Sequence, residues 1–207
     1  MSVHEWQQFI AIQLSHIDIL QWAILILGFA EVLFAKANNP LLYPSGIAAT
    51  TLAIYSLFAV QLYAECALHL YYILMSVYGW WHWTSIKNST PVVVSFAKRR
   101  EWFISITIIF AGWGLLYFSL VTFTLSTVPA WDAWVSSTAW AGTWLLARRK
   151  VENWILLNVS NAFAVPLLFY KELPLFAVLT LILFGVACLG YFDWIKIARR
   201  TSHYETH

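Results

Sequence analysis

The sequence predicts an all-α integral membrane protein with seven transmembrane helices in a 3+1+3 parallel repeat, and three observations support this fold class. The composition is too apolar for a soluble domain, several apolar runs are long enough to cross a bilayer, and two parts of the chain share a pattern at a fixed offset. Of 207 residues, 61% are hydrophobic and only 11% are charged, whereas a soluble domain carries about 25% charged residues. This composition excludes a soluble bundle, a disordered chain and a disulfide scaffold.

Apolar windows of the length that a helix needs to cross a hydrocarbon core, about 20 residues, occur seven times. We expect helices at 19–37, 42–60, 62–84, 102–125, 131–147, 153–170 and 174–196. Each break between them carries turn-forming or charged residues. In order, the breaks are the Asn-Asn-Pro at 38–40, Gln61, the polar stretch 87–101, Pro129, the basic run 148–150, and Lys171 with Glu172.

The basic residues predict the orientation of the chain in the membrane. If the N-terminus is outside, eleven of the twelve Lys and Arg residues lie on the inner side and only Lys171 lies outside. The eleven are Lys36, Lys87, Lys98, Arg99, Arg100, Arg148, Arg149, Lys150, Lys196, Arg199 and Arg200. Because short cytoplasmic loops are enriched in Lys and Arg, we expect the N-terminus outside and the C-terminus inside. A missed span would scatter these charges, so the asymmetry also supports seven helices.

Two segments of the chain repeat at an offset of 111 residues. Residues 79–83 read Gly-Trp-Trp-His-Trp and residues 190–194 read Gly-Tyr-Phe-Asp-Trp. One extra helix, at 102–125, separates the two halves, and this odd number of crossings gives both halves the same orientation in the membrane. Transporters with parallel repeats of this kind hold their substrate between the halves near the midplane. The alternative is that aromatic residues at helix ends form ordinary interfacial belts.

The repeat and the charge pattern divide the chain into five parts. We expect an extracytoplasmic N-terminal segment at 1–18, a first three-helix repeat at 19–84, a cytoplasmic loop with a linker helix at 85–127, a second repeat at 128–196 and a cytoplasmic tail at 197–207. In the first part, Trp6, Phe9, Ile10 and Gln13 are spaced as in a short interfacial helix; a frayed terminus is the alternative.

Catalytic motifs are missing from the sequence, and the polar residues within the spans point to ligand binding. There is no nucleotide loop, nucleophile elbow, zinc-protease motif or Cys-x-x-Cys, so we expect neither an enzyme nor a cofactor or metal site. Glu31 lies about twelve residues, or roughly 18 Å, into its helix. A carboxyl group at that depth normally faces a cavity or a partner. A structural bond to a neighbouring helix, or a protonated acid, would also explain it.

Further candidate site residues are an imidazole, aromatic rings and amides within the spans. They are His69, Tyr72, Trp140, Trp154, Asn158 and Asn161. Acids, aromatic walls and amides together suit a flat, positively charged organic ligand. The alternatives are that Glu65 and His69, four residues apart on one helix face, pair with each other, and that the Trp side chains face lipid or pack in the core.

Several motifs resemble those of the PnuC family of bacterial vitamin-precursor transporters. They are Tyr43-Pro44-x-Gly46, Gln61-Leu62-Tyr63-Ala64, Tyr78-Gly79-Trp80-Trp81-x-Trp83, the Arg-Arg-Lys-Val-Glu-Asn-Trp at 148–154, and Asn161. The resemblance implies a fold similar to that of the SWEET sugar transporters and a homotrimer in the bacterial inner membrane, in contact with lipid and a small vitamin precursor. We expect no nucleic-acid partner, because the basic residues form short clusters between apolar runs and not a basic and aromatic face. It also implies facilitated diffusion, with trapping of the product by a cytoplasmic kinase.

The founding substrate of that family is nicotinamide riboside, a precursor for NAD biosynthesis, and relatives carry thiamine or riboflavin. Trp154 and Asn161 match family positions. The sequence departs from the nicotinamide riboside pattern at Leu157, His69 and Ala49, where the family has Trp, Gln and Asn. We therefore expect a nicotinamide riboside transporter, with thiamine or another vitamin precursor as the alternative substrate. A seven-helix receptor or a membrane enzyme is a more distant alternative, since the cytoplasmic loops are short and no metal or nucleophile cluster is apparent.

Overall fold

The computed structural model describes residues 18–59, 63–85, 93–124 and 126–204. This part of the chain forms seven helices: α2 (Ile19–Lys36), α3 (Leu42–Ala59), α4 (Tyr63–Thr84), α5 (Arg99–Phe123), α6 (Pro129–Ala147), α7 (Asn153–Tyr170) and α8 (Pro174–Tyr204). The seven expected helices are thus confirmed. The expected interfacial helix near the N-terminus lies outside the described residues.

Two helix boundaries differ from the expected ones by three residues or more. Helix α5 begins at Arg99 rather than 102, because the Glu101 side chain accepts a hydrogen bond from the backbone N–H of Lys98 at 2.6 Å and so stabilises an earlier first turn. Helix α8 continues to Tyr204, so most of the segment expected as a tail is helical. Both boundaries were predicted at the limit of the apolar run, although charged residues can extend a helix beyond the membrane.

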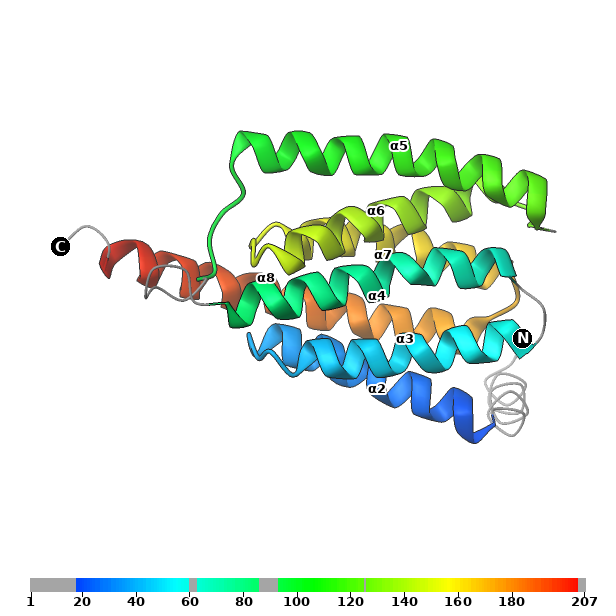
Figure 1. The fold of residues 1–207 in the computed structure, drawn as a ribbon, viewed down its shortest axis with the longest axis horizontal. Helices are drawn as coiled ribbons and strands as arrows, with labels where there is room; N and C mark the ends of the chain where they lie inside the picture. Colours follow the sequence, from blue (N-terminus) through cyan, green and yellow to red (C-terminus); the bar gives the residue numbers. More distant parts are fainter. Residues whose placement is uncertain (1–17, 60–62, 86–92, 125, 205–207) are drawn as a thin grey trace, which may run out of the picture.

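Five of the helices, α2, α3, α5, α7 and α8, are long and apolar enough to cross a membrane by length and composition. Helices α4 and α6 have 22 and 19 residues but are less apolar, because they carry many Trp and Tyr side chains. Figure 1 shows all seven helices lying side by side along one direction. The structure is therefore that of a seven-helix membrane bundle.

The helices pack as two groups of three with α5 on the outside. In the first group α2 packs on α3 and α3 on α4, and in the second group α6 packs on α7 and α7 on α8. Contacts of α2 with α8 and of α4 with α6 join the groups, whereas α5 lies along the outer side of α6 (Figure 1). This is the 3+1+3 arrangement expected from the sequence.

The turns that end α2 and α6 show the repeat in backbone detail. Asn38 and Arg149, 111 residues apart, both adopt left-handed backbone conformations, with φ of 55° and 59°. The N–H of Asn38 donates to the carbonyl of Ala35 at 2.9 Å, and the N–H of Arg149 donates to the carbonyl of Leu146 at 2.8 Å. Left-handed residues commonly end helices in this way. We call two residues 111 positions apart repeat mates.

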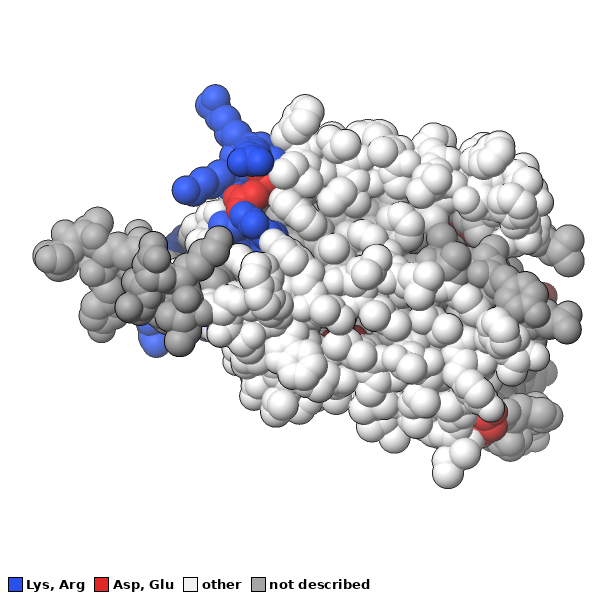
Figure 2. Space-filling view, in the orientation of Figure 1, with Lys and Arg blue, Asp and Glu red and all other residues white. Residues whose placement is uncertain are grey.

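Apart from Lys171, the described Lys and Arg side chains gather at one end of the bundle, which we call the basic end. Figure 2 shows the Lys and Arg side chains of the visible face clustered there. Within the cluster the Glu101 carboxylate pairs with Lys150 at 3.1 Å and Arg148 at 3.5 Å. The pairing ties the start of α5 to the loop between α6 and α7.

Candidate functional site

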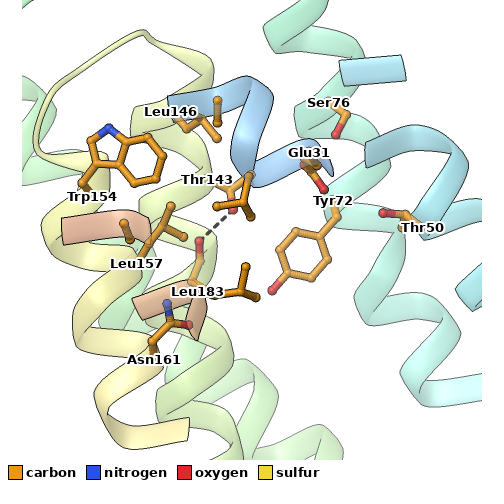
Figure 3. A pocket seen from close by; sticks show the side chains of 14 residues that line it. Glu31, Thr50, Tyr72, Ser76, Thr143, Leu146, Trp154, Leu157, Asn161 and Leu183 are labelled. Carbon is orange, nitrogen blue, oxygen red and sulfur yellow. Dashed lines mark hydrogen bonds between the residues drawn. The ribbon is translucent and has the colours of Figure 1, made fainter. Parts of the chain in front are cut away.

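A cavity of about 220 Å³ lies in the centre of the bundle, and all six helices of the two groups line it. Its walls are Glu31, Val32 and Ala35 of α2, Thr50 of α3, Tyr72 and Ser76 of α4, Ala139, Thr143 and Leu146 of α6, Trp154, Leu157 and Asn161 of α7, and Leu183 and Ala187 of α8. Figure 3 shows the Tyr72 ring and the Asn161 amide reaching into it from opposite walls. Helix α5 contributes no side chain.

Most of the cavity lining consists of repeat mates. Ten of the fourteen residues form five pairs at an offset of 111: Val32 with Thr143, Ala35 with Leu146, Thr50 with Asn161, Tyr72 with Leu183, and Ser76 with Ala187. Equivalent positions of both halves meet at one space only if that space lies on the axis relating the halves. The cavity is therefore on the pseudo-twofold axis, where transporters with parallel repeats hold their substrate.

The two halves contribute different chemistry to this symmetric cavity. A Cβ atom on Gly46 would lie 2.5 Å from Oε1 of Glu31, so the carboxylate of α2 rests directly on the backbone of α3. In the second half the glycine and the side chain change places. Gly142 is the repeat mate of Glu31, Leu157 is the repeat mate of Gly46, and a Cβ on Gly142 would lie 2.9 Å from Cδ2 of Leu157. The first half thus presents a carboxylate where the second half presents a leucine.

Glu31 determines the charge of the cavity. No Lys, Arg or His is among the residues that line it, and Thr50, Ser76, Thr143, Tyr72 and Asn161 supply neutral hydroxyl and amide groups. Among the described residues, no side chain or backbone group forms a hydrogen bond or ion pair with Glu31. A single carboxylate beside neutral polar groups and aromatic faces is an arrangement that binds an organic cation.

Trp154, in the first turn of α7, lines the cavity on the side of the basic end. The residue is 1% exposed, and its ring meets the edge of the Trp194 ring at 5.7 Å between centroids. Gly190 makes room for it, because a Cβ there would lie 2.7 Å from Cζ2 of Trp154. The buried indole N–H of Trp154 has no hydrogen-bond acceptor among the described residues.

A second cavity, of about 350 Å³, lies toward the opposite end of the bundle and contains two of the expected site residues. Tyr72 lines both cavities, and His69 and Trp140 line only this outer one. Near its mouth Lys171 pairs with Asp132 at 2.6 Å. The Trp140 ring stacks on Tyr71 with centroids 4.6 Å apart, so one of its faces is covered by protein.

Of the seven expected site residues, the structure brings four together in the central cavity: Glu31, Tyr72, Trp154 and Asn161. Asn158 instead lies on the side of α7 that faces α8, where its Nδ2 donates to Sγ of Cys188 at 3.4 Å. It lines a separate, almost entirely apolar pocket. The side chain of Glu65, the expected partner of His69, lies outside the described residues.

Sequence reasoning missed three polar residues of the central cavity: Thr50, Ser76 and Thr143. One signal was available, since the offset of 111 residues relates Thr50 to the expected site residue Asn161. Of the departures from the family pattern, Leu157 lines the central cavity and His69 the outer one. Ala49 is buried and belongs to neither lining.

Comparisons with known proteins agree with this architecture. The family model described as nicotinamide mononucleotide transporter matches residues 18–196. Proteins named nicotinamide riboside transporter PnuC from Escherichia coli K12 and Shigella flexneri are each 23% identical over 203 residues, covering 85% of this chain and 82% of theirs. A crystal structure titled as that of the vitamin B3 transporter PnuC superposes with a TM-score of 0.70 at 21% identity, over 97% of this chain and 94% of that one. At this identity the structural likeness shows the fold.

Proposed function

Because the chain belongs to the nicotinamide mononucleotide transporter family, we propose that it is a transporter, not an enzyme, and that it mediates facilitated uptake of nicotinamide riboside. The observation that carries this proposal is the central cavity, which lies on the repeat axis and contains one carboxylate and no basic side chain. Nicotinamide riboside carries a cationic pyridinium ring, a carboxamide and a ribose. A cytoplasmic kinase would then phosphorylate the product and prevent its return.

The lining favours the riboside over the phosphorylated mononucleotide in the family's name. A phosphate group carries up to two negative charges, and the cavity offers no Lys, Arg or His side chain to pair with them. Bringing that phosphate into the bundle beside Glu31 would combine desolvation with repulsion between like charges. The pyridinium ring has the opposite charge and is attracted to the same carboxylate.

We assign the substrate contacts to the four expected residues in the central cavity and to the hydroxyls beside them. Glu31 faces the cationic ring, and Tyr72 and Trp154 provide aromatic walls. Asn161 and Thr50, which are repeat mates, hydrogen-bond the carboxamide and ribose from opposite halves. His69 and Trp140 lie in the outer cavity on the approach to Tyr72, and we assign no substrate contact to Asn158.

The charge distribution supports the orientation that we propose. With the basic end in the cytoplasm of a bacterial cell, the bundle obeys the positive-inside rule, and the outer cavity with His69 opens to the outside. The protein is then a multi-pass inner-membrane transporter with its N-terminus out and its C-terminus in. The homotrimer implied by the family resemblance stays a prediction.

Thermal unfolding of the detergent-purified protein with a ligand panel tests the proposed substrate. We expect nicotinamide riboside to raise the melting temperature, since a ligand at 100 times its dissociation constant adds about 2.7 kcal/mol to stability. We expect nicotinamide mononucleotide at the same concentration to have no effect. Equal stabilisation by the mononucleotide would contradict the charge argument, and no stabilisation by the riboside would contradict the proposed substrate.

Thiamine belongs in the same panel because two observations favour it as a second candidate. Its thiazolium ring is also a cation that Glu31 could face, and Leu157 lines the cavity where the family pattern has a tryptophan. Losing one aromatic or amide contact can change which ligand a pocket prefers. Stabilisation by thiamine alone would make it the substrate and would leave the role of Glu31 unchanged.

A further inference from the structure

Two residues that line the central cavity, Ala35 and Leu146, accept hydrogen bonds from tryptophans of the opposite half. Nε1 of Trp83 in α4 donates to the carbonyl of Leu146 in α6 at 3.2 Å, and Nε1 of Trp194 in α8 donates to the carbonyl of Ala35 in α2 at 3.0 Å. Trp83 and Trp194 are repeat mates of each other, and so are the residues that accept their bonds, Ala35 and Leu146. The two bonds are therefore one interaction made twice, once in each direction between the halves.

Two pairs of repeat mates contact each other at this end, which places them on the axis. The rings of Trp83 and Trp194 have centroids 5.9 Å apart, and Nε of Arg149 donates to Oδ1 of Asn38 at 2.9 Å. In a twofold arrangement a residue can touch its own counterpart only close to the axis. Because the cavity lies on the same axis, both pairs lie across the route that runs along this axis from the cavity to the basic end.

The contacts around these pairs hold them in place. The Arg149 guanidinium lies 4.3 Å from the centroid of a Trp83 ring, a favourable cation–π distance. Burial lowers the pKa of Arg149 from its ordinary value, yet an arginine stays charged at neutral pH. Tyr43 and Trp154, repeat mates again, meet the edges of Trp83 and Trp194 at 5.2 and 5.7 Å. The same packing thus supports both tryptophans.

We propose that Trp83 and Trp194 form the gate that closes the central cavity at the basic end. They are positioning residues. Each indole hydrogen-bonds to the C-terminal end of the first helix of the opposite half, α6 for Trp83 and α2 for Trp194. The Asn38–Arg149 hydrogen bond crosses the same axis. Opening this end requires α4 to part from α6 and α8 from α2, which breaks both indole bonds together. The symmetry explains how the two halves can be released in one step.

Accessibility of a cysteine in the cavity tests the gate without any substrate. Ser76 lines the cavity, so Ser76→Cys, with Cys66→Ala and Cys188→Ala, places the thiol there. Inside-out vesicles, identified by protease cleavage of a tag after α8, expose the basic end to a membrane-impermeant methanethiosulfonate reagent. We expect Trp83→Phe and Trp194→Phe each to raise the labelling rate from this end by about fivefold, the effect of one lost hydrogen bond.

A matched control removes an indole bond that does not cross between the halves. Nε1 of Trp131 donates to the carbonyl of Phe163 at 3.0 Å within the second half, so Trp131→Phe should leave labelling unchanged. Asn38→Gly keeps the left-handed backbone and removes the bond to Arg149 while both tryptophan side chains remain, and it too should raise labelling. Two results would overturn the proposal. One is unchanged labelling from the basic end in both the monodisperse Trp83→Phe/Trp194→Phe protein and Asn38→Gly. The other is an equal rise in the labelling rate of Trp131→Phe.

Discussion

Replacing Glu31 with glutamine is expected to weaken the binding of nicotinamide riboside by about 10- to 150-fold, the range for one charged interaction. The reason is that Glu31 is the one acidic side chain among the residues that line the central cavity, and no basic side chain there compensates for it. Glutamine keeps the size of the side chain beside Gly46 and removes only its charge. Titration calorimetry on purified wild-type and Glu31→Gln protein measures the change.

A neutral ligand of similar shape separates the effect of charge from that of shape. Reduced dihydronicotinamide riboside lacks the positive charge of the pyridinium ring, so Glu31→Gln should bind it about as well as the wild type does. Equal affinity of both proteins for the cationic riboside would show that Glu31 does not face the ring, although the proposed transport function would stand. If the wild type binds neither riboside, the proposed substrate is wrong and Glu31→Gln carries no information about it.

Replacing Gly190 with alanine is expected to destabilise the protein by about 1–3 kcal/mol, the usual effect of overfilling a packed core. The added methyl would lie 2.7 Å from Cζ2 of Trp154, and that ring is 1% exposed and held by Trp194. Trp194 blocks one side of the Trp154 ring, so the ring must tilt into the central cavity that it lines or α8 must shift away from α7. Thermal unfolding in detergent measures the loss, and substrate uptake into proteoliposomes should fall because Trp154 is also a cavity wall.

Gly185 provides the matched control on the same helix. A Cβ atom at this position meets no atom within 4 Å, so Gly185→Ala should be neutral or slightly stabilising, as expected for alanine in a helix interior. The comparison holds the chemical change constant and varies only the space around it. If Gly190→Ala were as stable as Gly185→Ala, the close packing of Trp154 against α8 would not contribute to the fold.

The expected helices were confirmed because a membrane span imposes its own length and composition. Half of the boundaries coincide with the expected ones and most of the others differ by one or two residues. The larger differences lie where charged residues continue a helix, as in α5 at Glu101 and in α8 as far as Tyr204. Apolar windows cannot detect such extensions. The offset of 111 residues, read from five positions, also predicted that corresponding helices of the two groups occupy equivalent places.

The candidate site was only partly predictable, and Asn158 shows why. It follows Trp154 by four residues, about 40° around the helix, yet Trp154 and Asn161 line the central cavity while Asn158 turns toward Cys188 of α8. Lipid is as apolar as a helix interface, so a membrane helix that is apolar on all sides does not reveal its inward face. Polarity alone therefore placed Asn158 among the candidate residues, whereas the packing of α7 against α8 turns its side chain away from the central cavity.

The sequence by itself determined the number of helices, their 3+1+3 order, the clustering of basic charge and the repeat, because bilayer thickness and charge impose these features locally along the chain. Only the tertiary structure decided which repeat mates meet at the axis. Glu31 resting on Gly46 and the crossed hydrogen bonds of Trp83 and Trp194 join residues far apart in sequence. The physical reason is that helix rotation and separation are set by close packing at the interfaces, where a glycine's missing side chain decides which residue can approach.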